Sequence, residues 1–257
     1  MPAAQSNSHA LKSLILIHGW GTNSAIWLPI LPLLKAHFQV TVMDLPGFGF
    51  NTDNDHLGSL ASIAKYIANE IEIPSVIAGW SFGGLVSTQI ALDYPERCTH
   101  LINIASTPKF NADKITWSAG IAELELSRFR QALEKNPLKT LHDFIDLQLR
   151  GTMLDKQKIL QLKLTLRAFT PTTLAMKKTL RLLKTTDLRK DVKYLEAPTL
   201  YLFGDKDSFI PSNTIHQIYE NCPTHEYQII PRATHAPFLS RPEIFRQHLL
   251  KFCGIAT

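Results

Sequence analysis

The sequence has few cysteines, and it has no apolar run long enough to serve as a signal sequence or as a transmembrane segment. It contains three cysteines in 257 residues, and Cys98, Cys222 and Cys253 are too few and too widely spaced for a disulfide framework or a C-x-x-C motif. The apolar run at residues 14–17 is too short for a signal sequence or a membrane span. We therefore expect a cytoplasmic protein with reduced thiols.

Several signatures of ligand and cofactor binding are also missing. The sequence has no internal repeat, no low-complexity tract, no phosphate-binding G-x-x-x-x-G-K loop, no dinucleotide fingerprint and no metal-ligand spacing. Its basic residues are not interleaved with aromatic residues, as they are in a nucleic-acid-binding stripe. We therefore expect chemistry carried by side chains alone, without a cofactor, a metal or a nucleic-acid partner.

The sequence does contain a regular alternation of strand and helix patterns. Short apolar runs occur at residues 14–17, 39–43, 75–79, 101–104, 199–203 and 227–230. One helix is expected to begin after Ser24, which would cap it, and further helical patterns occur at residues 59–71, 82–93, 212–219 and 242–252. This alternation predicts an α/β fold with a mostly parallel sheet covered on both faces. With 45% hydrophobic residues, the chain suffices for one main domain.

The alternation is interrupted between residues 108 and 187, where strand patterns are missing. Amphipathic helical patterns are found instead at 119–134, 137–150, 155–168 and 172–184. We interpret residues 108–187 as a helical cap inserted into a core made of residues 1–107 and 188–257.

The positive charge of the chain is concentrated in this insertion. Between Lys109 and Lys190 there are 17 basic and 8 acidic residues, a balance of +9, whereas the rest of the chain has 10 basic and 14 acidic residues, a balance of −4. A basic cap attracts an anionic substrate or an acidic protein partner. The alternative is an ordinary solvated helical face.

A candidate nucleophile lies at the end of the run at residues 75–79. Gly79-Trp80-Ser81-Phe82-Gly83 matches the G-x-S-x-G nucleophile elbow, in which a serine is raised on a sharp turn between a strand and a helix. A side chain at Gly79 or Gly83 would crowd this turn. A chance turn between a strand and a helix is the alternative, so the interpretation requires a base and an acid elsewhere in the chain.

The chain offers both groups beyond the ends of later strands. Asp207 follows the strand pattern at 199–203, and His235 follows the one at 227–230. The order Ser81, Asp207, His235 is the order of α/β-hydrolases. Asp205 lies in the same loop as Asp207 and is the alternative acid. Stabilisation of the oxyanion is expected from the backbone N–H groups of Phe82 and Trp20.

His18 lies beside the glycine-rich loop Gly19-Trp20-Gly21. One interpretation is that it orders this loop, and the other is that it is a packed core histidine.

Together, five motifs resemble a known superfamily. They are His18-Gly19-Trp20-Gly21, Asp44-Leu45-Pro46-Gly47-Phe48-Gly49, Gly79-Trp80-Ser81-Phe82-Gly83-Gly84, the stretch from Leu183 to Arg189, and Thr234-His235-Ala236-Pro237-Phe238. The sequence resembles the α/β-hydrolases over nearly its whole length. Within them it is most similar to the BioH family, the pimeloyl-acyl-carrier-protein methyl ester esterases of biotin synthesis, because of Trp20, Trp80 and the 183–189 stretch.

The resemblance implies a site and a partner. It implies a triad of Ser81, Asp207 and His235, and a cap that receives the acidic acyl-carrier protein. It also implies that a segment of the cap lines the substrate channel: Phe144, Ile145, Asp146, Leu147 and Gln148. In the family, basic residues of the cap contact the carrier. Two of them are matched here by Lys139 and Lys156, whereas Asp143 and Leu160 stand at two other such positions.

These observations lead to a functional prediction. We expect a monomeric serine carboxylesterase that hydrolyses the methyl ester of pimeloyl-acyl-carrier protein methyl ester and releases methanol. A small-molecule carboxylesterase or a carbon–carbon-bond hydrolase with the same triad is the alternative among enzymes. A thioesterase that releases the carrier thiol, and a non-enzymatic ligand receptor, are further alternatives.

Overall fold

A single parallel sheet forms the centre of the computed structural model, which describes residues 11–256 except 114, 119, 211 and 212. Its six strands lie in the order β2-β1-β3-β4-β5-β6, and every neighbouring pair is parallel. The strands are β1 (Lys12–Ile17), β2 (Phe38–Met43), β3 (Ser75–Trp80), β4 (Cys98–Ile104), β5 (Thr199–Gly204) and β6 (Glu226–Ile230). The prediction of a mostly parallel sheet is confirmed.

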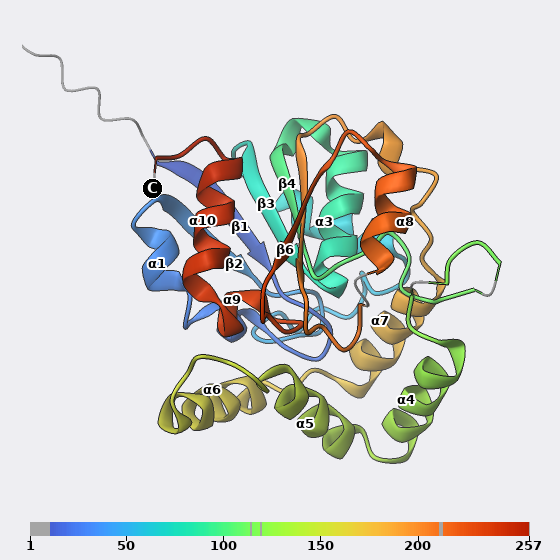
Figure 1. Cartoon of the computed structure of the whole chain (residues 1–257). Helices are drawn as coiled ribbons and strands as arrows, with labels where there is room; N and C mark the ends of the chain where they lie inside the picture. Colours follow the sequence, from blue (N-terminus) through green and yellow to red (C-terminus); the bar gives the residue numbers. More distant parts are fainter. Residues whose placement is uncertain (1–10, 114, 119, 211–212, 257) are drawn as a thin grey trace, which may run out of the picture.

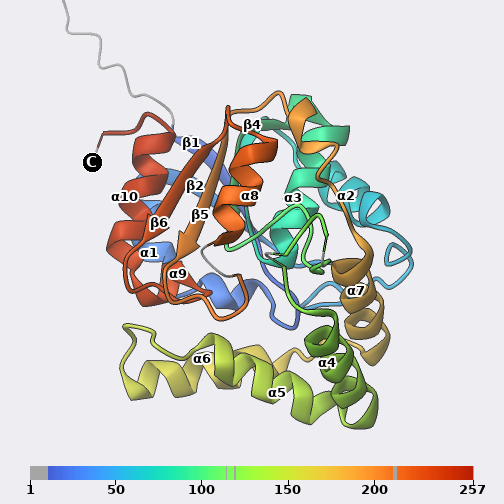
Figure 2. The ribbon, with the colours of Figure 1, turned by 45° about the vertical axis from the view of Figure 1, so that its right-hand side comes forward.

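Helices cover both faces of this sheet, as Figure 2 shows. On one face lie α1 (Leu31–Lys35) and α10 (Pro242–Phe252), and on the other lie α2 (Leu60–Asn69), α3 (Phe82–Asp93) and α8 (Asn213–Asn221). Every residue of β3 and of β5 is buried, whereas the edge strands β2 and β6 are partly exposed. This explains why the central strands read as continuous apolar runs, since both of their faces are covered.

The first helical region differs from the prediction of one helix capped by Ser24. It consists of a 3₁₀ turn, η1 (Ser24–Trp27), followed by the short helix α1, and the cap of η1 is Asn23, whose side chain accepts a hydrogen bond from the backbone N–H of Ala25. Pro29 and Pro32 explain the interruption, because proline cannot donate the backbone hydrogen bond that a continuous helix needs. Three further short helices were not predicted: η2 (Pro95–Arg97), η3 (Val192–Tyr194) and α9 (Pro237–Ser240).

The predicted insertion contains four helices. They are α4 (Glu123–Lys135), α5 (Pro137–Gln148), α6 (Lys156–Ala168) and α7 (Thr173–Thr185). In Figure 1, α4, α5 and α6 run below the sheet and α7 leads back to it, on the side where the strands end. The last three helices begin after a capping side chain that accepts a backbone hydrogen bond, namely Asn136, Asp155 and Thr172. The observed starts lie within one residue of the expected 137, 155 and 172.

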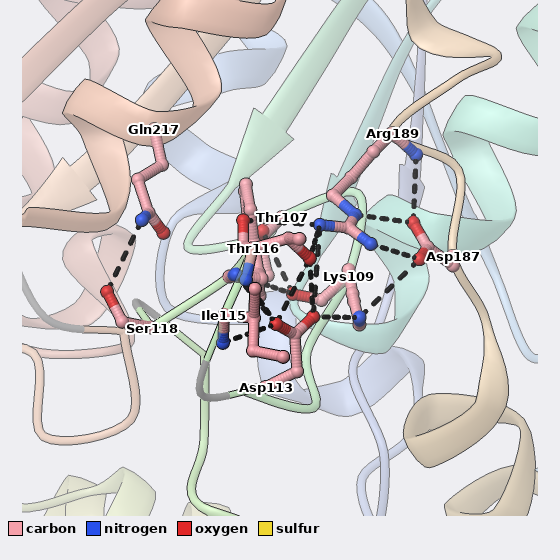
Figure 3. A network of polar contacts seen from close by, with 10 residues as sticks. Thr107, Lys109, Asp113, Ile115, Thr116, Ser118, Asp187, Arg189 and Gln217 are labelled. Carbon is pink, nitrogen blue, oxygen red and sulfur yellow. Dashed lines mark hydrogen bonds and ion pairs between the residues drawn. The ribbon is translucent and has the colours of Figure 1, made fainter.

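A polar network joins the two ends of the insertion (Figure 3). Lys109 Nζ lies 2.7 Å from Asp113 Oδ2 and 3.5 Å from Asp187 Oδ2. Arg189 donates two hydrogen bonds, of 2.8 and 2.7 Å, to the carboxylate of Asp187, and its guanidinium lies 5.5 Å from the centre of the Trp117 ring. The hydrogen bond from Lys109 lowers the pKa of Asp113. The segment before α4 is thereby tied to the segment after α7.

Two sequence expectations concern compartment and membranes. Cys98, Cys222 and Cys253 are all buried and free. Among the residues that the structure describes, no helix has the length and apolar character that crossing a bilayer requires.

Candidate active site

Ser81 occupies the sharp turn between β3 and α3. Its φ of 55° and ψ of −118° lie outside the regions that L-residues ordinarily adopt, so the backbone is strained there. Three hydrogen bonds hold the turn. Ser81 N–H donates to the carbonyl of Ile104 at 2.8 Å, and the carbonyl of Ser81 accepts from Gly84 N–H at 2.9 Å and from Ser106 Oγ at 2.8 Å. The neighbouring strand β4 therefore supports the strained residue.

The two glycines that flank Ser81 permit this geometry. A Cβ atom at Gly83 would collide with the main-chain oxygens of Ile17 and His18, and one at Gly79 would collide with the carbonyl of Gly83. Helix α3 thus starts in direct contact with the end of β1, which brings the serine beside the loop that follows β1. A side chain at either position would move the helix away.

His235 and Asp207 form a buried pair beyond the ends of β6 and β5. The distance between His235 Nδ1 and Asp207 Oδ2 is 2.8 Å, and the side chains are 7% and 0% exposed. The other carboxylate oxygen of Asp207 accepts hydrogen bonds from the backbone N–H groups of Phe209, at 2.7 Å, and Ile210, at 3.0 Å. Because an ionised carboxylate only accepts, the proton of the neutral imidazole is held on Nδ1, and Nε2 is left as a base.

Asp205, the alternative acid, is placed differently. Its side chain is 35% exposed, and its carboxylate lies 3.9 Å from Lys206 Nζ. The structure therefore pairs His235 with Asp207 and leaves Asp205 at the surface.

Trp80 contacts the main chain of His235. Its indole Nε1 donates a 2.7 Å hydrogen bond to the main-chain oxygen of His235, which is 155 positions away in the sequence, and the indole is fully buried. The sequence marked Trp80 only as part of a family motif, and its contact with the candidate base was not foreseen. A tryptophan directly before the elbow serine was the available signal.

A cavity of about 610 Å³ opens over Ser81 and His235. It lies between the core and the insertion, since α4, α5 and α7 all contribute to its wall. Its aromatic side chains are Trp20, Phe110, Phe129, Phe144 and Phe209. Apart from Ser81 and His235, the polar side chains that reach it are Glu125, Arg128 and Ser208. A cavity of this size and polarity suits an extended apolar ligand with one reactive polar end.

Trp20 connects the loop after β1 to the helices of the insertion. Its ring packs edge to face against Phe129, at 5.1 Å between ring centres, and against Phe144, at 5.0 Å. Its indole N–H donates to the main-chain oxygen of Met176 on α7 at 3.0 Å. The residue therefore belongs to the cavity wall as well as to the loop that was expected to stabilise the oxyanion.

The predicted channel segment on α5 lines the cavity only in part. Phe144 and Leu147 reach the cavity. Ile145 is fully buried in the hydrophobic core, Gln148 is 2% exposed and does not line the cavity, and Asp146 lies 2.9 Å from Arg167 Nη2. The helical repeat places 144 and 147 on one face of α5 and turns 145 and 146 away from it, whereas Gln148 stands one turn beyond Phe144 and is buried behind the cavity wall.

Phe82, the second expected source of an oxyanion-binding N–H, is the first residue of α3. A backbone N–H at this position has no acceptor within its own helix. The Phe82 side chain is fully buried and does not line the cavity, so the role expected of this residue rests on its backbone N–H alone.

His18 is both a packed histidine and a link between two loops. Its Nδ1 donates to the carbonyl of Gly19 at 2.8 Å, and its Nε2 accepts from the backbone N–H of Leu45 at 3.0 Å. Burial lowers the pKa of His18. His18 is therefore a buried core histidine, and its hydrogen bonds also order the loop at Gly19.

Lys139 and Lys156, which the resemblance placed against the carrier, are exposed at the starts of α5 and α6. Lys139 Nζ lies 2.6 Å from the carboxylate of Asp143, so its charge is already paired.

Comparison with known proteins gives the family of the chain. The sequence profile of the α/β hydrolase fold family matches residues 12–242. The pimeloyl-[acyl-carrier protein] methyl ester esterase of Legionella pneumophila (strain Corby) is 38% identical over 232 residues, which cover 90% of this chain and 91% of the relative. The enzyme of the same name from Citrobacter koseri is 37% identical over 247 residues, covering 96% of this chain and 94% of the relative.

Solved structures support the fold alone. An esterase from Exiguobacterium antarcticum has a TM-score of 0.85 at 17% identity, covering 95% of this chain and 92% of that one. A bromoperoxidase from Bacillus anthracis has a TM-score of 0.82 at 20% identity, with coverages of 95% and 92%. The chain belongs to the α/β-hydrolase family, and within it to the family of the pimeloyl-[acyl-carrier protein] methyl ester esterases.

Proposed function

We propose that this protein is a serine esterase that hydrolyses the methyl ester of pimeloyl-acyl-carrier protein methyl ester, producing methanol and the free carboxylate on an intact carrier thioester. The observation that carries the proposal is that His235, which is paired with the buried Asp207, lines the same apolar cavity as the strained Ser81. The names of the relatives supply the substrate class. We place the reaction in the cytoplasm, where buried free cysteines stay reduced.

The catalytic roles follow from the geometry of these side chains. Nε2 of His235 takes the proton of Ser81 as Oγ attacks the ester carbonyl, and the backbone N–H groups of Trp20 and Phe82 stabilise the oxyanion. The imidazolium then donates its proton to the leaving methoxide, which departs as methanol. Water attacks the acyl-enzyme with His235 again as the base. Asp207 keeps the imidazole in the productive tautomer throughout and stabilises its cationic form.

We interpret residues 108–187 as a cap that decides which bond is cut. The proposed substrate has two acyl bonds, the methyl ester at one end of the chain and the carrier thioester at the other. If the methyl end enters first, past Phe144 and Leu147, only the ester carbonyl reaches Ser81. A carbonyl outside the oxyanion site loses about 3 kcal/mol for each missing donor, which is about a hundredfold in rate.

Product analysis tests the proposal. Mass spectrometry of the carrier after incubation with the enzyme is expected to show loss of the methyl group and an intact thioester, with turnover falling as the acyl chain is shortened. The Ser81→Ala variant is the control, and it is expected to be folded and to lose hydrolysis by several orders of magnitude. Free carrier thiol formed at a comparable rate would replace the proposal with a thioesterase. Hydrolysis of small esters alone would indicate a small-molecule esterase.

A further inference from the structure

Trp80 and Phe209 both pack against the imidazole of His235, but they differ in their access to the catalytic cavity. The centre of the Trp80 ring lies 5.7 Å from the centre of the imidazole, and the centre of the Phe209 ring lies 4.9 Å from it. Trp80 is fully buried and does not line the cavity, whereas Phe209 is half-buried and lines it together with His235 and Ser81. A bound ester therefore meets Phe209 directly beside the base.

Two further contacts fix the position of Phe209. Its backbone N–H donates a 2.7 Å hydrogen bond to Asp207, the acid that is paired with His235 at 2.8 Å. Its ring also contacts Phe144 of α5, with 6.0 Å between the ring centres. Aromatic rings at this separation touch each other, so an alkyl chain does not pass between Phe144 and Phe209. The ring is thus a fixed part of the cavity wall next to His235.

The mechanism places the alcohol part of the ester beside His235. Nε2 of the imidazolium donates its proton to the departing alkoxide, so the alkoxide oxygen must come within about 2.6–3.2 Å of this nitrogen. The alkyl group on that oxygen then lies next to the imidazole, against the ring that packs on it. The longer acyl part is left to the rest of the cavity, whose apolar wall comes largely from α4, α5 and α7.

We propose that Phe209 is a specificity-determining residue, which restricts the alcohol group of the ester to one as small as methyl. This inference rests on the proposed function, because it requires His235 to protonate the leaving group. A longer alkyl group collides with the Phe209 ring, which cannot turn aside without losing its contacts with Phe144 and His235. Without the ring, the additional methylene groups of a longer alcohol would gain apolar contact and favour binding.

Two esters that differ only in the alcohol test the role of Phe209. The methyl and the butyl ester of pimeloyl-acyl-carrier protein have the same carrier and the same acyl chain, and mass spectrometry of the carrier follows the hydrolysis of each. The quantity compared is the ratio of their kcat/KM values. If a substitution merely loosens His235, it slows both esters alike and leaves this ratio unchanged, so the ratio reports the contact with the alcohol alone.

Phe129→Ala is the matched control for Phe209→Ala. Phe129 is also half-buried and lines the same cavity. Its ring packs against Trp20 at 5.1 Å and Phe144 at 5.8 Å, and no ring contact joins it to His235 within the described part of the chain. The two variants therefore remove the same ring from the same cavity, but only one of them removes it from beside the base.

The wild-type enzyme is expected to prefer the methyl ester over the butyl ester by about tenfold or more, because a closely packed pocket discriminates single methylene groups. Phe209→Ala is expected to reduce the preference to about threefold or less, and Phe129→Ala to leave it within about twofold of the wild-type value. Phe209→Leu keeps an apolar side chain of intermediate size, so an intermediate ratio is expected, and this variant decides the matter if Phe209→Ala does not fold.

Three results would overturn the inference: a wild-type enzyme without preference for the methyl ester, Phe209 variants with the wild-type ratio, or an equal loss of preference in Phe129→Ala. A wild-type enzyme that hydrolyses neither ester would instead overturn the proposed function.

Discussion

Replacement of Asp207 by asparagine separates a catalytic role from a structural one. The substitution keeps the shape of the side chain, and its amide oxygen still accepts the hydrogen bonds from the backbone N–H groups of Phe209 and Ile210. It changes only the group that faces His235 Nδ1, at the 2.8 Å contact, from a hydrogen-bond acceptor to a donor. The imidazole proton must then move to Nε2, and the base required by Ser81 is lost.

The expected magnitude is large for kcat and small for stability. Loss of the productive tautomer costs about 10⁴ in kcat, which corresponds to about 5.5 kcal/mol in the activation free energy. The free energy of unfolding is expected to fall by only about 1–3 kcal/mol, because one buried hydrogen bond is replaced by a poorer one. Hydrolysis of a small methyl ester and urea unfolding measure the two quantities on the same sample.

Asp205→Asn is the matched control in the same loop. Its carboxylate is partly exposed and lies 3.9 Å from Lys206 Nζ, so its removal is expected to change kcat by less than about twofold. If Asp205→Asn lowers kcat as much as Asp207→Asn, or if Asp207→Asn retains near wild-type turnover, the assignment of the acid is wrong.

Two further predictions concern residues that support the site. Trp80→Phe removes the hydrogen bond to the main-chain oxygen of His235, and the free energy of unfolding is expected to fall by about 1–3 kcal/mol. We also expect kcat to decrease while KM changes little. Unchanged kinetics would mean that Trp80 contributes only to packing. Burial lowers the pKa of His18 below 6.5, so its contribution to stability is full above about pH 6.5 and is lost as the pH falls through its folded pKa. Urea unfolding of wild type and His18→Gln across this range is expected to show a shallower pH dependence in the variant; equal slopes would assign it to other groups.

The sequence by itself determined the six strands, the longer helices and the position of the candidate nucleophile. Continuous apolar runs predict central strands because residues of β3 and β5 are buried on both faces. The glycines around Ser81 indicate the elbow because the close approach of α3 to the end of β1 excludes a side chain there. Both signals are local, since each depends on neighbouring residues and on the sheet or helix they form.

Only the tertiary structure decided which distant groups meet. Asp205 and Asp207 are equivalent by composition, and the choice arises because only Asp207 is turned inward, against His235. The hydrogen bond of Trp80 to His235 joins residues 155 positions apart, and no periodicity encodes such a contact. The excess of positive charge in the insertion was countable, but which cations remain unpaired depends on helix packing. Side-chain partners are set by three-dimensional distance, which a linear pattern constrains only within one helix or one strand.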